Sequence, residues 1–238
     1  MTWLYKEYAG IVIQVSNSEF FSFVDFNFPK SESMAAVDGT LWITEKDTNS
    51  FVVFLPKETD DYYGYTYYDA FTQLDSALPY STSDYFRPVF LALNATHLFT
   101  AFLNEAFLIN AVSESITRLE DPTVLSINGS FAGLFENGNG EMELVVAGGR
   151  GSNGTTEIFS PKHGTWRSGP LMPVVLEHGA SVQYGNTFLA VGGMDNNGTA
   201  TKSVYMFDPE GWIEMPQKME NGRAFFAAFL VDEDYLPC

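Results

Sequence analysis

Short apolar runs alternate with polar turn segments along most of the chain. The run Leu144–Ala147 is continuously apolar, which is typical of a strand that is buried on both faces. Asn153-Gly154 and Asn197-Gly198 lie between apolar runs, where such dipeptides predict hairpin turns. The segment Asp69–Leu78 is the single weak candidate for a helix. The pattern predicts an all-β fold.

One segment of this pattern occurs twice, from Glu141 to Pro173 and from Asn186 to Pro216. Both the Gly-Gly pairs and the Asn-Gly-Thr turns of the two copies are 44 residues apart. A period of this length is the mark of a repeat architecture. The glycines are expected where the chain takes positive φ or approaches a neighbour closely, and the tryptophans where sheets pack. These repeat residues are Gly148, Gly149 and Trp166 in the first copy and Gly192, Gly193 and Trp212 in the second.

The repeat resembles the kelch motif, whose unit is one four-stranded blade of a β-propeller. The resemblance is clear over residues 130–223 and degenerate elsewhere. It implies a kelch-like β-propeller in a single domain, 1–238, with blades at 34–86, 87–129, 130–177 and 178–222 and a further blade shared by 1–33 and 223–238. The segment Arg223–Val231 is expected to be the strand that closes this ring of about five blades, which removes exposed sheet edges. The alternative is a fragment of a six- or seven-blade ring.

Composition narrows the possible partners. The 238 residues are 45% hydrophobic, which is enough to bury a core, and the net charge is −18 from 30 acidic and 12 basic side chains. This charge disfavours binding to nucleic acid or anionic lipid and favours a basic protein partner. No apolar run approaches the roughly 18–20 residues of a membrane helix, so membrane insertion is not expected.

Cysteine and glycosylation signals leave the compartment open. Cys238 is the single cysteine, so neither an intrachain disulfide nor a zinc site built on cysteines is expected. The start of the chain lacks the pattern of a signal peptide. N-glycosylation sequons, all in predicted turns, are present at Asn94, Asn128, Asn153 and Asn197. If the chain is a fragment of a longer protein, an extracellular location is favoured, and if it is complete, a cytoplasmic location is favoured. The sequons are either glycan acceptors or residues that only form turns.

The sequence contains no convincing catalytic motif. Its histidines, His97, His163 and His178, fall in different repeats, so no metal site is expected. No Gly-x-Ser-x-Gly elbow is present, and acidic pairs such as Asp60-Asp61 are too common here to indicate a glycosidase. The copper-radical oxidases among kelch-like proteins use an internal cysteine, which this chain lacks. We therefore expect no enzyme activity and no cofactor.

The kelch resemblance then implies a non-catalytic protein–protein interaction module. Tyrosine and arginine side chains are common at binding surfaces. The candidate contact residues are Tyr63, Tyr65, Tyr67, Arg150, Arg167 and Arg223. The tyrosines have a second interpretation, as an outer strand packed on a neighbouring blade. Two other functions remain open: a secreted N-glycosylated structural or adhesion domain, and a kelch-type carbohydrate-active enzyme.

Overall fold

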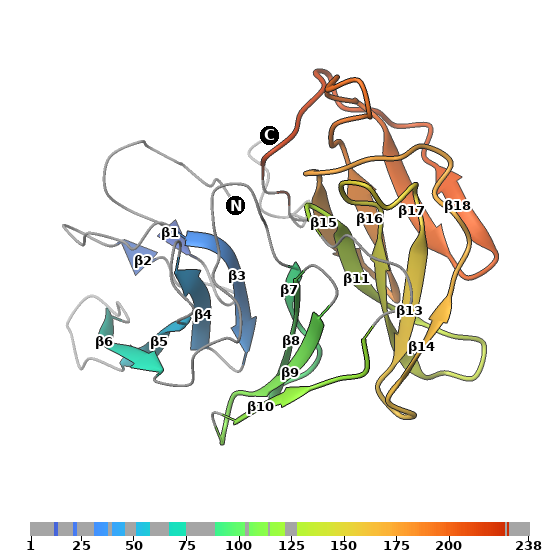
Figure 1. Ribbon diagram of the computed structural model, residues 1–238. Coiled ribbons are helices and arrows are strands. Elements are labelled where there is room, and N and C mark those ends of the chain that lie inside the picture. Colours follow the sequence, from blue (N-terminus) through green and yellow to red (C-terminus); the bar gives the residue numbers. More distant parts are fainter. Residues whose placement is uncertain are drawn as a thin grey trace. The chain divides into compact units, whose positions relative to one another are not determined.

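The computed structural model describes residues 12–13, 21–22, 31–37, 40–45, 51–57, 67–74, 89–102, 105–113, 115–121, 128–226 and 228. The chain forms two compact units, one of Met1–Ser83 with Val231–Cys238 and the other of Asp84–Leu230. Figure 1 shows the strands and labels all of them except β12. The ranges 1–33 and 223–238, predicted to share a blade, fall largely outside the described residues.

The first unit contains a two-stranded ribbon and a four-stranded antiparallel sheet. The ribbon pairs β1 (Val12–Ile13) with β2 (Phe21–Ser22). The sheet is a meander of β3 (Ser31–Val37), β4 (Thr40–Glu45), β5 (Phe51–Lys57) and β6 (Tyr67–Leu74). The helix considered at Asp69–Leu78 is wrong over residues 69–74, because β6 pairs with β5 there and sets Phe71 opposite Phe54, and residues 75–78 lie outside the described residues. Aromatic and β-branched residues favour such pairing over helix formation.

The second unit contains three four-stranded antiparallel meanders in its described part. In each sheet the strands follow the order of the chain, as Figure 1 shows. The first sheet consists of β7 (Val89–Ala92), β8 (His97–Phe102), β9 (Glu105–Asn110) and β10 (Ser115–Arg118). The second consists of β11 (Phe131–Glu136), β12 (Met142–Ala147), β13 (Thr156–Ser160) and β14 (Thr165–Ser168). The third consists of β15 (Ala180–Tyr184), β16 (Thr187–Val191), β17 (Val204–Asp208) and β18 (Gly211–Glu214).

Strand β12 lies between two hydrophobic cores, as its continuous apolar run predicts. Leu144 and Val146 pack in a cluster with Phe99 of the first sheet, whereas Val145 and Ala147 pack in a cluster with Phe188 of the third. Successive side chains of a strand point to opposite faces, so one strand supplies both clusters. The stacked sheets of this unit are therefore held together chiefly by burial of apolar surface.

The edge of β11 is covered by polar side chains of the next sheet. The amide of Ala132 donates to Ser181 Oγ (2.9 Å), and the amide of Leu134 donates to Gln183 Oε1 (3.2 Å). The Gln183 amide nitrogen in turn donates to the carbonyl of Leu134 (3.0 Å). These bonds satisfy backbone groups that an open sheet edge would leave exposed.

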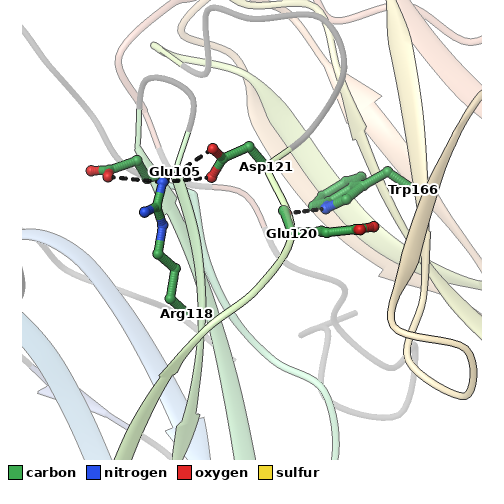
Figure 2. Close-up of polar contacts among 5 residues, drawn as sticks. All are labelled: Glu105, Arg118, Glu120, Asp121 and Trp166. Atoms are coloured by element: carbon green, nitrogen blue, oxygen red, sulfur yellow. Dashed lines mark hydrogen bonds and ion pairs between the residues drawn. The ribbon is translucent and has the colours of Figure 1, made fainter.

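The two repeat tryptophans link neighbouring sheets in the same way. The indole nitrogen of Trp166 donates to the carbonyl of Glu120, two residues after β10 (2.8 Å; Figure 2). The indole nitrogen of Trp212 donates to the carbonyl of Pro170, two residues after β14 (3.2 Å), and to Thr156 Oγ1 (3.1 Å). A partner for the N–H group lets each large ring be mostly buried at no loss of a hydrogen bond.

The expected closing strand does not begin at Arg223. Residues 223–226 are not in a strand. The amide of Phe225 donates to the carbonyl of His178 (2.7 Å), and in the same way the amide of His178 donates to the carbonyl of Gly129 (2.7 Å). Residues 223–226 are thus the counterpart of 176–179, the segment that leads into β15. The remainder of the predicted strand, apart from Ala228, lies outside the described residues.

Candidate functional site

The connecting segments at one end of the second and third sheets form a continuous surface, which we call the Gly-Gly end. It consists of the segments 148–155, 169–179, 192–203 and 215–226. Backbone hydrogen bonds join these segments: Gly149 to Leu176 (2.8 Å), Met172 to Gly154 (2.8 Å), Glu177 to Met194 (3.0 Å) and Gly193 to Arg223 (2.8 Å).

The repeat glycines make this surface compact. Gly148 and Gly192 have φ of 66° and 61°, in the left-handed region that glycine adopts without steric cost. A Cβ at Gly148 would lie 2.6 Å from the Leu176 carbonyl oxygen, and one at Gly192 would lie 2.6 Å from that of Arg223. The same close approach therefore occurs in both repeats, and the neighbouring Gly149 and Gly193 also have positive φ.

Three equivalent residues at this end share a left-handed backbone, although two of them are not glycine. They are Gly129 (φ 68°), His178 (φ 57°) and Phe225 (φ 56°). The left-handed conformation costs a non-glycine residue about 1–2 kcal/mol, and such strain is concentrated at functional sites. It persists here because the hydrogen bonds between successive members hold the backbone in place.

The side chains of these residues form a stack. The rings of His178 and Phe225 are stacked, with centroids 4.3 Å apart and an angle of 21° between their planes. A Cβ at Gly129 would come within 2.5 Å of His178 Nδ1, so glycine makes room for the imidazole ring. His178 is buried, whereas the Phe225 side chain is 51% exposed. The stack thus presents an aromatic surface to solvent on a buried support.

Further apolar side chains are exposed in the neighbouring segment 169–179. Leu171 is 65% exposed and Val174 is 41% exposed. Met172, which lies between them, and Leu176, which follows them, are buried. Single exposed apolar residues are ordinary, but several on one set of loops are typical of contact surfaces. The sequence did not single out Phe225, Leu171 or Val174.

The predicted arginines are only partly brought together. Arg150 and Arg223 are exposed at the Gly-Gly end. Arg167 lies on the outer strand β14, where its guanidinium donates to Glu143 Oε2 (2.5 Å) across the sheet. Arg167 is therefore engaged within its own sheet and is not part of the same surface.

Of the three predicted contact tyrosines, one lies within the described residues. Tyr63 and Tyr65 lie outside the described residues, and Tyr67 is the first residue of β6. The contact role of these tyrosines and their alternative role in an outer strand both stay predictions.

The sequons differ in accessibility. Asn94, Asn153 and Asn197 are exposed, whereas Asn128 is only 3% exposed. A glycan is bulky and must project into solvent, so the burial of Asn128 makes it a poor glycan acceptor in the folded chain. Asn153 and Asn197 belong to the Gly-Gly end, and Asn94 lies in the turn between β7 and β8.

Two ion pairs change the pKa values of carboxyl groups at the second and third sheets. A hydrogen bond from Lys162 lowers the pKa of Glu141, and one from Lys218 lowers the pKa of Glu214. The same bond raises the pKa of Lys218. In the described part of the chain, no three His, Cys, Asp or Glu side chains converge on a point that could hold a metal ion. That part also has no helix of the length and hydrophobicity needed to span a membrane.

Comparisons with known proteins agree with this architecture. The family model for the kelch motif matches residues 178–213, which extend from just before β15 into β18. The solved structure of YjhT superposes with a TM-score of 0.62 at 16% sequence identity, covering 83% of this chain and 68% of that one. No curated protein matches the sequence.

The molecule is thus an all-β protein of the β-propeller class. More particularly, its fold is the kelch-type propeller fold, with a kelch motif in the third sheet of the second unit. The likeness to YjhT supports the fold alone, since function depends on the residues at a site.

Proposed function

We propose that this chain is a non-catalytic protein–protein interaction module that binds its partner with the Gly-Gly end. The observation that carries the proposal is the half-exposed Phe225 ring, held by a left-handed backbone and stacked on buried His178. A ring fixed in this way loses little conformational entropy when a partner covers it.

The surroundings of Phe225 support the same function. Aromatic anchors and arginine are enriched in the centres of protein interfaces. Arg150 and Arg223 lie at the same end, as do the exposed side chains of Leu171 and Val174. These residues come from connecting segments on a rigid stack of sheets, which is where binding residues are commonly placed.

The test compares capture of proteins by the wild-type chain and by Phe225→Asn. Asparagine tolerates the left-handed backbone and removes the ring. The control is Val112→Ser, since Val112 is 76% exposed in the turn that follows β9. Partners identified by mass spectrometry should be lost with Phe225→Asn or with Leu171→Ser and retained with Val112→Ser, at unchanged Tm. Equal capture by all variants would exclude the Gly-Gly end as the binding surface.

A secreted glycoprotein domain is the second candidate, favoured by the exposure of Asn94, Asn153 and Asn197. The chain would be produced through a secretory pathway and its mass compared before and after enzymatic glycan removal. Glycans on these three asparagines, with Asn128 bare, would support this function. A kelch-type carbohydrate-active enzyme is the third candidate, and its test is turnover of a panel of sugars.

A further inference from the structure

The Gly-Gly end is far less acidic than the whole chain. Its four segments carry four basic residues against three acidic ones, and with Glu214, which pairs with Lys218 (2.9 Å) just outside them, the net charge is zero. The whole chain has a net charge of −18. The basic residues are Arg150, Lys202, Lys218 and Arg223, and the acidic ones are Glu177, Asp195 and Glu220.

Among the described residues of the second unit, the basic side chains without an ion pair are all at this end. Seven basic side chains are described in the second unit. Four of them form ion pairs with carboxylates: Arg118, Lys162, Arg167 and Lys218. The other three, Arg150, Lys202 and Arg223, are exposed and form no ion pair among the described residues. In a protein with more than twice as many acidic as basic residues, unpaired cations gathered on one surface require an explanation.

The backbone holds these three cations on joined segments. The amide of Arg223 donates to the carbonyl of Thr201 (3.2 Å), which places Arg223 beside the segment that carries Lys202. Arg150 is anchored by its own amide, which donates to the carbonyl of Asn128 (2.9 Å). The three side chains therefore project from segments whose backbones are fixed.

Of the three acidic side chains in these segments, Asp195 is engaged within its own loop. Asp195 Oδ1 accepts hydrogen bonds from the amides of Asn197 (2.9 Å) and Thr199 (2.8 Å), and so shapes its own loop. Glu177 is half-buried and pairs through its backbone with Met194. Glu220 is the exposed carboxylate among the three acidic residues of these segments.

We propose that the partner contacts the Gly-Gly end with an acidic segment, whose carboxylates pair with Arg150, Lys202 and Arg223. This inference rests on the proposed function and specifies the chemistry of the partner. Guanidinium groups bind carboxylates with charge-assisted and often bidentate hydrogen bonds. The sign is opposite to the basic partner expected from the net charge alone.

Salt screening determines which charges of the chain affect binding of the partner. At about 0.15 M salt the Debye length is roughly 8 Å, so exposed charges farther away act weakly. An acidic segment docked at the Gly-Gly end is then governed by the cations it touches, and the distant acidic residues contribute little. At about 0.01 M salt the Debye length is roughly 30 Å, and repulsion from the whole chain should weaken binding.

The experiment measures binding of a fluorescein-labelled poly-glutamate peptide to the full chain by fluorescence anisotropy near physiological salt. A poly-lysine peptide and a heparin fragment are compared under the same conditions. The test variant is Arg150→Gln/Lys202→Gln/Arg223→Gln. The matched control is Lys162→Gln/Arg167→Gln, which removes two exposed cations that lie away from this surface.

We expect the triple variant to weaken poly-glutamate binding by about tenfold, as the loss of several exposed ion pairs predicts, and the control to leave it unchanged. Absence of poly-glutamate binding, equal binding by the triple variant, or tighter binding of poly-lysine or heparin would overturn the inference. The protein-capture experiment distinguishes failure of the acidic-segment inference from failure of the proposed function. Partners that are retained by the triple variant and lost with Phe225→Asn would support the module and contradict the acidic segment.

Discussion

Gly133 in the inner strand β11 is the residue at which the packing of the second unit is most directly testable. It is buried, and the ring of Phe188 from the third sheet packs against it. A Cβ at this position would lie 2.2 Å from Cγ and 2.5 Å from Cβ of Phe188. Phe188 is fully buried within the cluster that joins the second and third sheets, so its ring has little room to move.

Gly133→Ala should therefore lower the stability of the protein. Extra methyl groups in a well-packed core cost about 1–3 kcal/mol. In a chain of this size each kcal/mol lowers Tm by roughly 2–4 °C. The matched control is Gly138→Ala, since a Cβ at Gly138 meets nothing within 4 Å. Reduced freedom of the unfolded chain should leave the control unchanged or stabilised by about 0.4–1 kcal/mol.

The assay is denaturant unfolding followed by tryptophan fluorescence and circular dichroism, with thermal melts in parallel. Gly133→Ala should lower the free energy of unfolding less in a Phe188→Leu background than in the wild-type chain, because the smaller side chain relieves the overlap. If Gly133→Ala and Gly138→Ala had the same free energy of unfolding, the close packing of β11 on β16 would be refuted.

Three further predictions concern the repeat residues and the exposed ion pairs. Gly148→Ala should destabilise the chain more than Gly164→Ala in thermal melts: both glycines have a φ near 67°, but only at Gly148 would the Cβ approach the Leu176 carbonyl. Trp212→Phe should lower the free energy of unfolding by about 1–3 kcal/mol, since the Pro170 carbonyl and Thr156 hydroxyl lose their donor, and Thr156→Val should cost less. Lys218→Met should raise the pKa of Glu214 toward its ordinary value of 4.5, as measured by NMR titration of the carboxyl carbon. The lowered pKa of folded Glu214 means that its stabilising contribution is present above pH 4.5 and is lost as the pH falls through the folded pKa, and this pH dependence should diminish in Lys218→Met.

The elements that were predictable are those in which one local pattern has one structural meaning. The continuous apolar run of β12 indicated burial on both faces, and the two hydrophobic clusters on either side of the strand show it. The Gly-Gly pairs indicated positive φ and close backbone approach, which both repeats have. The fold class followed from these features because each repeat has to bury its faces against the next.

The stack of His178 and Phe225 was not predictable from the repeat spacing. The spacing between equivalent residues grows from 44 at the glycine pairs to 46 at the tryptophans and 47 at His178 and Phe225. The increase comes from longer connecting segments, which carry no hydrophobic period. The expected closing strand was consequently placed too early, and Phe225 was assigned to a strand although its backbone is left-handed. Contacts made by side chains between sheets, such as those of Ser181 and Gln183 with β11, leave no local signal either.

Two of the sequons lie on the surface that is proposed to bind the partner, so glycosylation there and partner binding exclude each other. Asn153 and Asn197 lie in the segments that also carry Arg150 and Lys202, so glycans there would cover the Gly-Gly end. Asn94 lies in the β7–β8 turn, where its side-chain oxygen accepts hydrogen bonds from the amides of Thr96 (2.9 Å) and His97 (3.0 Å). This turn is at the opposite end of the sheets, because the equivalent bonds of Trp166 and Trp212 place the ends of β10 and β14 alike and each sheet is a four-stranded meander. A glycan on Asn94 alone is therefore compatible with partner binding, whereas glycans on Asn153 and Asn197 would favour the structural glycoprotein over the interaction module.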